Sequence, residues 1–447
     1  MMTGQRLRVL AIAEAANPEW VSVPLVGWSL ANALREVADV HIVTQVRNRD
    51  AFLRAGLREG VDFTAIESEA LARPLWALGQ KLRMGEGKGW TTLQLINALS
   101  YPWFEHLVWK AFGADITAGQ YDIVHRITPL SPTLSSPIAA KCARAGVPFV
   151  LGPLNGGVPW PEGFDRERRR EREWLSYLRS AYKALPGRRA TLTHASAILV
   201  GSRHTLGEMP EAMRGKCVYL PENAIDPARF SHAPAPGTGP LRAGFVGRLV
   251  PYKGPDMLIE AAAPLLRAGT LRLDLVGDGP MMGDLRAQAE ALGVSEAITF
   301  HGWLPHKDVQ NVLAACHLFA FPSIREFGGG VVLEAMALGV PPLIVDYAGP
   351  GELVQAGRGY KVPIGPRERI ISGFRTALAF LAEDRTALAE TGQTARAWVA
   401  QNFTWDRKAE QVLDVYQAVL SGAPLPVFFE RPTPASCAPW AQGEVPT

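Results

Sequence analysis

A glycine-rich stretch within residues 321–354 has the residue types of an anion-binding site. A strand-like run there ends in a Pro-Ser turn, an acidic residue follows, and three glycines precede a helix predicted to start near Val331. Backbone amides at the start of a helix lack partners within it and point one way, and the helix dipole adds positive potential. We therefore expect a diphosphate to bind these amides. They belong to Gly328, Gly329, Gly330 and Val331.

Two carboxylates flank these glycines. Glu326 precedes them and Glu334 lies about one turn into the predicted helix, so a bend separates the two side chains and they need not share one partner. A carboxylate accepts hydrogen bonds well from vicinal hydroxyls. Each of the two carboxylates is therefore suited to bind vicinal hydroxyls.

Two cations occupy a second loop. Arg248 directly follows a strand-like run, and Lys253 comes five residues later, before a Gly-Pro and the next predicted helix. Open parallel sheets bind ligands at the carboxyl ends of their strands, and two cations there suit a phosphate. An isolated Arg/Lys pair is more often a pair of solvated loop residues, and it is the glycine-rich acidic loop that favours the functional interpretation.

The elements that must position these residues form a regular pattern. Short Val/Ile/Leu-rich runs alternate with amphipathic stretches in two series, which indicates βα units with buried parallel strands. The pattern predicts an α/β protein with two parallel-sheet domains. The first series is 8–13, 39–44, 121–127, 148–153 and 196–202, and the second is 241–248, 271–279, 297–303, 317–323 and 341–347.

A Pro/Gly/Ala-rich stretch without apolar periodicity separates the two series and indicates an interdomain linker. The predicted layout is an N-terminal Rossmann-like domain at 1–230, the linker at 231–240, a C-terminal domain at 241–403 that carries the predicted anion site, a helix at 404–422 that can cross back to the first domain, and a loose Pro-rich tail at 423–447.

The composition indicates an ordinary globular protein, with 47% hydrophobic and 20% charged residues among 447. The four cysteines are far apart and form no CxxC or Cys/His cluster, so neither a disulfide framework nor a zinc site is indicated. No apolar run approaches the length of about 18 residues typical of a membrane span. We expect a cytoplasmic protein that binds no nucleic acid.

Residues 162–190 combine many arginines with Trp and Tyr side chains in a helical stretch. Such a stretch is typical of a helix that lies on an anionic membrane surface. A solvated helix with one buried stripe and interleaved Glu/Arg pairs explains it about equally well. If the membrane interpretation holds, the protein is peripheral at the inner face of the membrane.

The C-terminal half resembles glycosyltransferase family four. The donor domain of that family runs VGRL-x-x-x-KG, then V-G-x-GP, then PS-x-x-E-x7-E, and here these motifs fall at 246–254, 276–280 and 322–334. The resemblance covers roughly residues 195–355 and implies a GT-B fold, in which two Rossmann-like domains face each other across a cleft. It also implies transfer with retention of anomeric configuration.

The resemblance implies a role for each matching residue. Arg248 and Lys253 would contact the donor diphosphate, Glu326 the hydroxyls of the transferred sugar, and Glu334 the ribose diol. The family usually has E-G-F-G where this chain has Glu326-Phe-Gly-Gly, so the sugar pocket differs in detail. The further donor-binding positions are Gly247, Gly277, Asp278 and Gly279, together with Gly328, Gly329, Gly330 and Val331; the 275–285 glycine segment alone does not complete a GxGxxG fingerprint.

The N-terminal half matches the family less closely. Residues 21–28 resemble a G-S-E-P-G-V-G-W loop before the first helix but lack two of its glycines and the glutamate, which leaves Gly27 for the close approach to the leaving phosphate. His125 is expected to end a strand and matches the first histidine of a D-x-x-H-x-H pattern. It contacts donor or acceptor on one interpretation and is structural on the other. Asn155, Gly156 and Gly157 line the acceptor side or form a tight strand exit.

Together these observations predict a retaining glycosyltransferase that moves a sugar from a nucleoside-diphosphate donor to a glycan or lipid-linked acceptor in cell-surface polysaccharide or glycolipid synthesis. The predicted catalytic residues are His125, Arg248, Lys253 and Glu326. No D-x-D sequence occurs, so we expect fixed protein charges instead of a metal, and no cofactor. A sugar-nucleotide epimerase and a non-catalytic nucleotide-sugar-binding protein remain as alternatives, whereas a glycosidase or a nicotinamide oxidoreductase fits the motifs less well.

Overall fold

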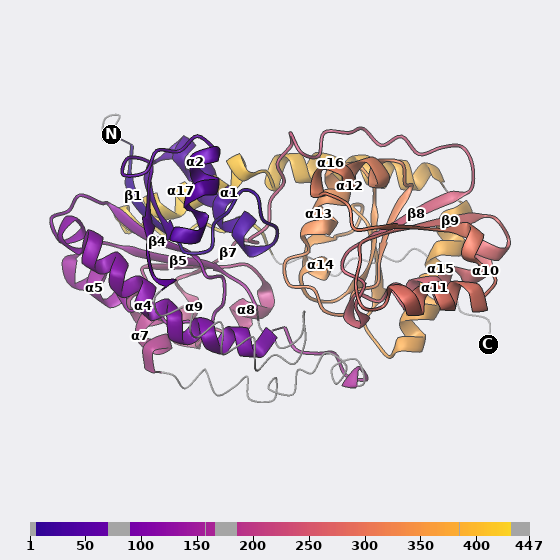
Figure 1. Ribbon diagram of the computed structural model, residues 1–447, viewed down its shortest axis with the longest axis horizontal. Coiled ribbons are helices and arrows are strands. Elements are labelled where there is room, and N and C mark those ends of the chain that lie inside the picture. Colours follow the sequence, from indigo (N-terminus) through magenta and orange to yellow (C-terminus); the bar gives the residue numbers. More distant parts are fainter. Residues whose placement is uncertain (1–5, 70–89, 157, 166–185, 384, 431–447) are drawn as a thin grey trace. The chain divides into compact units, whose positions relative to one another are not determined.

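The computed structural model describes residues 6–69, 90–156, 158–165, 186–383 and 385–430, which fall into two compact units (Figure 1). Of these residues, unit 1 contains 6–69, 90–156, 186–222 and 405–430, and unit 2 contains 158–165, 223–383 and 385–404. The sequence assigns all of 1–230 to the first domain. The structure differs because 158–165 and 223–230 pack with unit 2.

Unit 1 is built on a parallel sheet with the strand order β3-β2-β1-β4-β5-β6-β7. Its strands are β1 (Arg8–Ala13), β2 (Asp39–Gln45), β3 (Phe63–Ile66), β4 (Ile123–Thr128), β5 (Phe149–Leu154), β6 (Ala197–Val200) and β7 (Cys217–Tyr219). Its helices are α1 (Val23–Val37), α2 (Arg49–Arg54), α4 (Trp90–Thr117), α5 (Ile138–Ala145), α7 (Pro186–His194), α8 (Arg203–Gly207), α9 (Glu211–Arg214) and α17 (Trp405–Ser421), with a 3-10 turn η1 (Val46–Asn48).

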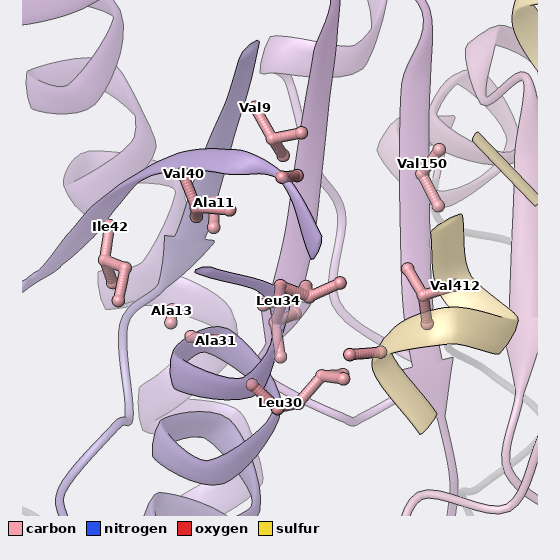
Figure 2. Close-up of a cluster of buried hydrophobic side chains, with 14 of the residues drawn as sticks. Val9, Ala11, Ala13, Leu30, Ala31, Leu34, Val40, Ile42, Val150 and Val412 are labelled. Atoms are coloured by element: carbon pink, nitrogen blue, oxygen red, sulfur yellow. The ribbon is translucent and has the colours of Figure 1, made fainter. Parts of the chain in front are cut away.

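The strands of unit 1 are buried on both faces, which explains their continuous apolar runs. Side chains of a strand alternate between the faces, so Val9 and Ala11 join a core with α1 and α17, whereas Leu10 and Ile12 join one with α4 and α5. Figure 2 shows the first of these cores, in which Val412 of α17 lies among residues of the strands and of α1.

The last helix of the described chain belongs to unit 1. Helix α17 packs along α1, and Tyr416 is fully buried in the shared core. Beyond it, the tail that the sequence predicts to be loose is packed as far as residue 430: Phe428 and Phe429 lie against the same core, and the Phe429 ring meets Tyr219 edge to face. The two aromatic side chains hold this part of the tail because they cover apolar surface.

Unit 2 contains a second parallel sheet, with the strand order β10-β9-β8-β11-β12-β13. Its strands are β8 (Leu241–Val246), β9 (Leu271–Val276), β10 (Ile298–Gly302), β11 (Leu318–Phe321), β12 (Pro342–Asp346) and β13 (Tyr360–Pro363). Its helices are α10 (Pro255–Arg267), α11 (Met282–Ala291), α12 (His306–Ala314), α13 (Gly330–Ala337), α14 (Ala348–Leu353), α15 (Arg367–Glu383) and α16 (Arg385–Asn402), with the 3-10 turns η4 (Pro251–Lys253) and η5 (Ser295–Ala297).

The sheet of unit 2 is covered on both sides: Figure 1 shows α12, α13 and α16 on one side and α10, α11 and α15 on the other. Its strand order is that of a doubly wound nucleotide-binding fold. Strands β8 to β10 are added in one direction across the sheet and β11 to β13 in the other, so the switch point lies between β8 and β11. Ligands of such sheets bind outside the carboxyl ends of the strands at this switch point. A ligand is therefore expected to bind at the loops after β8 and β11.

The two parallel-sheet domains predicted from the sequence are confirmed, and each predicted strand overlaps an observed one. The strands that the sequence analysis missed are β3, β7 and β13, which have three or four residues each. In the described parts of the chain, no helix has the length and apolar character needed to cross a membrane.

Candidate functional site

The loop after β8 carries Lys253 at the end of η4. Gly254 follows in the left-handed region, with φ 71°, and a Cβ atom there would lie only 2.6 Å from the carbonyl oxygen of Pro322. Only glycine satisfies both demands without strain. The Lys253 loop can therefore lie directly against the loop that follows β11.

Hydrogen bonds join the two loops. The Tyr252 carbonyl accepts from the Ile324 amide at 2.9 Å and from the Ser323 hydroxyl at 3.2 Å. Just beyond these bonds, the Lys253 ammonium forms an ion pair with the Glu326 carboxylate. The sequence analysis selected Lys253 and Glu326 separately, and the structure brings them together at the switch point.

This ion pair is shielded from water, since the two side chains are 16% and 18% exposed. Burial lowers the pKa of Lys253, and the Glu326 carboxylate acts in the opposite direction by favouring the charged ammonium. The ammonium also lies 5.1 Å from the centre of the Phe321 ring. An incoming phosphate can replace Glu326 as the partner of Lys253, which frees the carboxylate to accept hydrogen bonds from hydroxyls.

Helix α13 starts at Gly330, one residue before the position predicted from the sequence. Its N-cap, Gly329, is left-handed with φ 61°, and no side chain caps the helix. The Val332 amide donates to the Gly329 carbonyl at 2.9 Å, so the amides of Gly330 and Val331 are the ones that point out of the helix start without an intrahelical partner. A Cβ atom on Gly330 would meet the Asn223 side chain at 3.5 Å, so that amide side chain borders the helix start.

Glu334 faces a histidine that the sequence analysis did not select. Nε2 of His306, the first residue of α12, lies 2.9 Å from the Glu334 carboxylate. The pKa of His306 is raised, chiefly by this hydrogen bond. His306 lies only four residues after β10 in the chain, and the strand order of the sheet, which the sequence does not state, is what brings the two helices together.

Arg248 differs from Lys253 in its surroundings. It is exposed, two residues beyond the end of β8, and no ion pair of Arg248 is found among the described residues. Its guanidinium is thus available to solvent or to a ligand, whereas Lys253 already has a protein partner. The structure places the two predicted cations on one loop, after β8.

The predicted donor-binding glycines at the ends of β8 and β9 pack against each other. Cβ atoms on Gly277 and Gly279 would collide with the carbonyl oxygens of Gly247 and Leu249. The Gly247 amide donates to Val276 at 3.0 Å, which holds the turns in contact. These glycines shape the loop, and Asp278 accepts a hydrogen bond from the next amide in its own turn at 2.7 Å.

Replacing Gly277 by alanine should destabilise the protein by roughly 2–5 kcal/mol, because the new methyl group collides with backbone at a φ of 135° that side chains rarely adopt. Gly283 in α11 is the matched control, since nothing lies within 4 Å of its added Cβ. Alanine there should raise stability by about 0.4–1 kcal/mol. Chemical denaturation measures both, and equal midpoints for the two variants would refute the packing role.

A cluster beside the Lys253–Glu326 pair was missed by sequence reasoning. The Arg325 guanidinium stacks on Trp160 at 5.1 Å and on Phe327 at 5.5 Å, and Trp160 meets Tyr252 edge to face. The Tyr347 hydroxyl donates to the Pro159 carbonyl at 2.9 Å. These contacts are why residues 158–165 belong to unit 2. The signal in the sequence was a tryptophan between two prolines.

In unit 1, the expected loop at 21–28 is mostly helix, because α1 begins at Val23 with Pro24 in its first turn, where proline is favoured. Gly27 is buried inside α1, and a Cβ atom there would collide with the carbonyl of Ala15. The prediction of a glycine loop at this position is therefore wrong: the residues that would keep the loop open are missing, and Gly27 serves helix packing.

His125 lies in the middle of β4 and not at its end, which corrects the sequence prediction. It is fully buried; its Nε2 donates to the Gly152 carbonyl at 2.6 Å, so its Nδ1 accepts from the Tyr416 hydroxyl at 2.6 Å when the ring is neutral. Burial lowers the pKa of His125 to about 4, which keeps the ring neutral. This geometry fits the structural interpretation and offers no nitrogen to a ligand.

Asn155 follows β5 and is also held by protein contacts. Its side-chain amide donates to Glu222 at 2.6 Å, and its oxygen accepts from the Gly156 amide at 2.8 Å. The Gly156 carbonyl accepts from Thr205 at 3.4 Å. This is the tight strand exit that was one of the two interpretations. Gly157, and residues 166–185 of the proposed membrane helix, lie outside the described residues.

Part of unit 2 matches a known family model. Residues 229–396 match the family model of glycosyl transferases group 1. This segment is therefore similar to the glycosyl transferases group 1 family. The chain is 38% identical over 203 residues to a D-inositol 3-phosphate glycosyltransferase of Nocardia farcinica. That match covers 43% of each chain, so less than half of this relative's length is represented.

A longer match has a lower identity. The putative colanic acid biosynthesis glycosyltransferase WcaL of Salmonella typhimurium is 29% identical over 313 residues, which cover 63% of this chain and 74% of the relative. Among solved structures, HepE of Anabaena in complex with UDP has a TM-score of 0.60 at 16% identity, over 92% of this chain and all of HepE. Together with the two parallel sheets, this likeness shows a two-domain GT-B fold.

Proposed function

We propose that the protein is a retaining glycosyltransferase that transfers a sugar from a nucleoside-diphosphate donor. The observation that carries the proposal is the Lys253–Glu326 ion pair at the switch point of unit 2, beside the uncapped start of α13. The Lys253 ammonium and the amides at the start of α13 are suited to bind a diphosphate. The Glu326 carboxylate beside them is suited to accept hydrogen bonds from sugar hydroxyls. The family of residues 229–396 supports the same assignment.

In this proposal, different residues of unit 2 bind different parts of the donor. Lys253, the exposed Arg248 and the first amides of α13 hold the diphosphate, Glu326 binds the transferred sugar, and Glu334 binds the ribose diol. As the glycosidic bond breaks, negative charge grows on the departing nucleoside diphosphate, and preorganised cations and amides stabilise it. The complexes of HepE with UDP and with UDP-glucose make uridine nucleotides the first donors to try.

We further propose a glycan or lipid-linked acceptor in cell-surface polysaccharide or glycolipid synthesis, with the protein at the inner face of the membrane. The likeness to a putative colanic acid glycosyltransferase supports this acceptor class. The membrane contact rests on the basic, Trp- and Tyr-containing sequence at 162–190. Cosedimentation with anionic and with neutral vesicles tests that contact, and a protein that binds neither contradicts it.

The decisive experiment for the activity follows the sugar of radiolabelled UDP-, GDP- and ADP-sugars with and without a membrane-derived acceptor extract. Transfer predicts label in the acceptor and release of nucleoside diphosphate that depends on the acceptor. An epimerase would convert the donor sugar without acceptor, and a non-catalytic binding protein would leave all donors unchanged. Either of these outcomes rejects the proposed activity.

The transfer should not depend on a divalent metal, because Lys253, Arg248 and the helix start supply the positive charge around the diphosphate. We expect the rate after treatment with EDTA and dialysis to equal the untreated rate within about twofold, which corresponds to less than about 0.5 kcal/mol in the barrier. Loss of turnover with EDTA that Mg²⁺ or Mn²⁺ restores would contradict this.

A further inference from the structure

His306 and Glu334 form a contact between α12 and α13 at the edge of the proposed donor site. The ring nitrogen Nε2 lies 2.9 Å from Oε1 of the carboxylate, which can only accept, so Nε2 is the donor. Phe230 meets the His306 ring edge to face at 5.4 Å and holds its other side. The histidine is therefore oriented by packing on one side and by Glu334 on the other.

The hydrogen bond from His306 involves only one of the two oxygens of the Glu334 carboxylate. Oε1 accepts the hydrogen bond from His306. Among the residues that the structure describes, no other hydrogen bond to either oxygen of the Glu334 side chain is found. Glu334 is 16% exposed at the side chain, so its free oxygen has limited access to solvent. Fixing one oxygen of a carboxylate also fixes the direction of the other, which prepares it for two neighbouring hydroxyls.

We propose that His306 is a positioning residue for the ribose of the donor: it holds Glu334 in the orientation in which the carboxylate accepts from both the 2′- and the 3′-hydroxyl. This inference rests on the proposed function, which assigns the ribose to Glu334. The competing explanation is that the pair only joins two helices. It predicts a change in stability with no change in the recognition of the ribose.

The two explanations predict different effects of His306 substitutions on the preference of the protein for ribonucleotides over 2′-deoxyribonucleotides. The probes are UDP, GDP and ADP and their 2′-deoxy counterparts, with Kd measured by calorimetry. For the base that binds, the wild-type protein should prefer the ribonucleotide by about 10-fold or more, as expected for a hydrogen bond to a charged group. His306→Phe keeps a ring against Phe230 but has no donor, and it should reduce this ratio at least about threefold.

His306→Gln is the matched control, because its amide nitrogen can replace Nε2 as the donor; it should keep the wild-type ratio. The deoxynucleotide itself should bind His306→Phe as tightly as wild type, since the diphosphate contacts are untouched. His306→Ala provides a second donor-free side chain if the phenylalanine variant does not fold. Thermal unfolding of each variant reports the structural contribution separately.

The Glu334→Ala variant distinguishes the inference from the proposed function. If it loses the ribose preference while the donor-free His306 variants keep the wild-type ratio, the positioning role is overturned and the assignment of Glu334 stands. If Glu334→Ala keeps the full preference, the ribose assignment and the inference are both overturned. If none of the nucleoside diphosphates binds the wild-type protein, the proposed function falls together with them.

Discussion

Replacing Glu326 by glutamine is expected to lower kcat about 100- to 1,000-fold, the usual cost of removing a group that stabilises a transition state. In the proposed function this carboxylate binds the transferred sugar, whose charge and shape change as the glycosidic bond breaks. The nucleotide should remain held by Lys253 and the start of α13, so the Kd for the free nucleoside diphosphate should change by less than about fivefold, within 1 kcal/mol. Steady-state kinetics and calorimetry measure the two quantities.

Glu260→Gln is the control for this variant. Glu260 in α10 also forms an ion pair, with Arg367 at 2.8 Å, and it lies on a helix outside the loops that carry the site. A partly exposed ion pair of this kind contributes about 0–1 kcal/mol to stability, so kcat should stay near wild type. Equal turnover of the two variants would show that the Glu326 carboxylate takes no part in the reaction.

Replacing Lys253 by alanine should weaken the binding of the nucleoside diphosphate and slow turnover, each by about 100-fold, since one preorganised charge contributes about 3 kcal/mol. The pH dependence gives a second measure. Burial lowers the pKa of Lys253 from 10.5 to about 7. The side chain is therefore a charged ammonium below about pH 7 and increasingly a neutral amine above it. A ligand that needs the charge should therefore bind more weakly as the pH rises from about 7 towards 10.5.

Lys253→Arg provides the comparison for the pH series, because arginine stays charged throughout this range. Titration of the ligand itself affects both proteins equally. The Kd of the wild-type protein divided by the Kd of Lys253→Arg should therefore grow with pH if Lys253 binds the diphosphate. A ratio that is constant with pH, or an alanine variant that binds like wild type, contradicts the role.

The sequence predicted the architecture of unit 2 well because β8 to β12 are apolar runs and the loops between them carry family motifs in order. The structure places Lys253 in the loop after β8, Glu326 in the loop after β11 and Glu334 in α13, where the sequence analysis expected them. The sequence could not show that Lys253 pairs with Glu326, because that contact depends on the neighbouring positions of β8 and β11 in the sheet. The same limit hid His306, which reaches Glu334 from another helix.

The predictions for unit 1 were less accurate for a related reason. Gly27 and His125 were interpreted from single matched positions, and neither position states what packs around it. The helix that contains Gly27 comes close to the Ala15 carbonyl, and His125 is enclosed by Tyr416 from the far end of the chain. The packing role of Trp160 on Arg325 likewise joins distant segments. Such long-range contacts leave no local periodicity in the sequence.

The most direct test of the central claim is thermal unfolding of the wild-type and Lys253→Ala proteins with UDP-, GDP- and ADP-sugars. A donor present at a hundredfold excess over its Kd should stabilise the wild-type protein by about 2.7 kcal/mol. The same concentration should leave Lys253→Ala stabilised by less than about 0.5 kcal/mol, because a hundredfold weaker Kd brings the ligand only to half saturation. If no nucleotide sugar stabilises the wild-type protein, or if both proteins are stabilised equally, the donor site does not lie at Lys253 and Glu326.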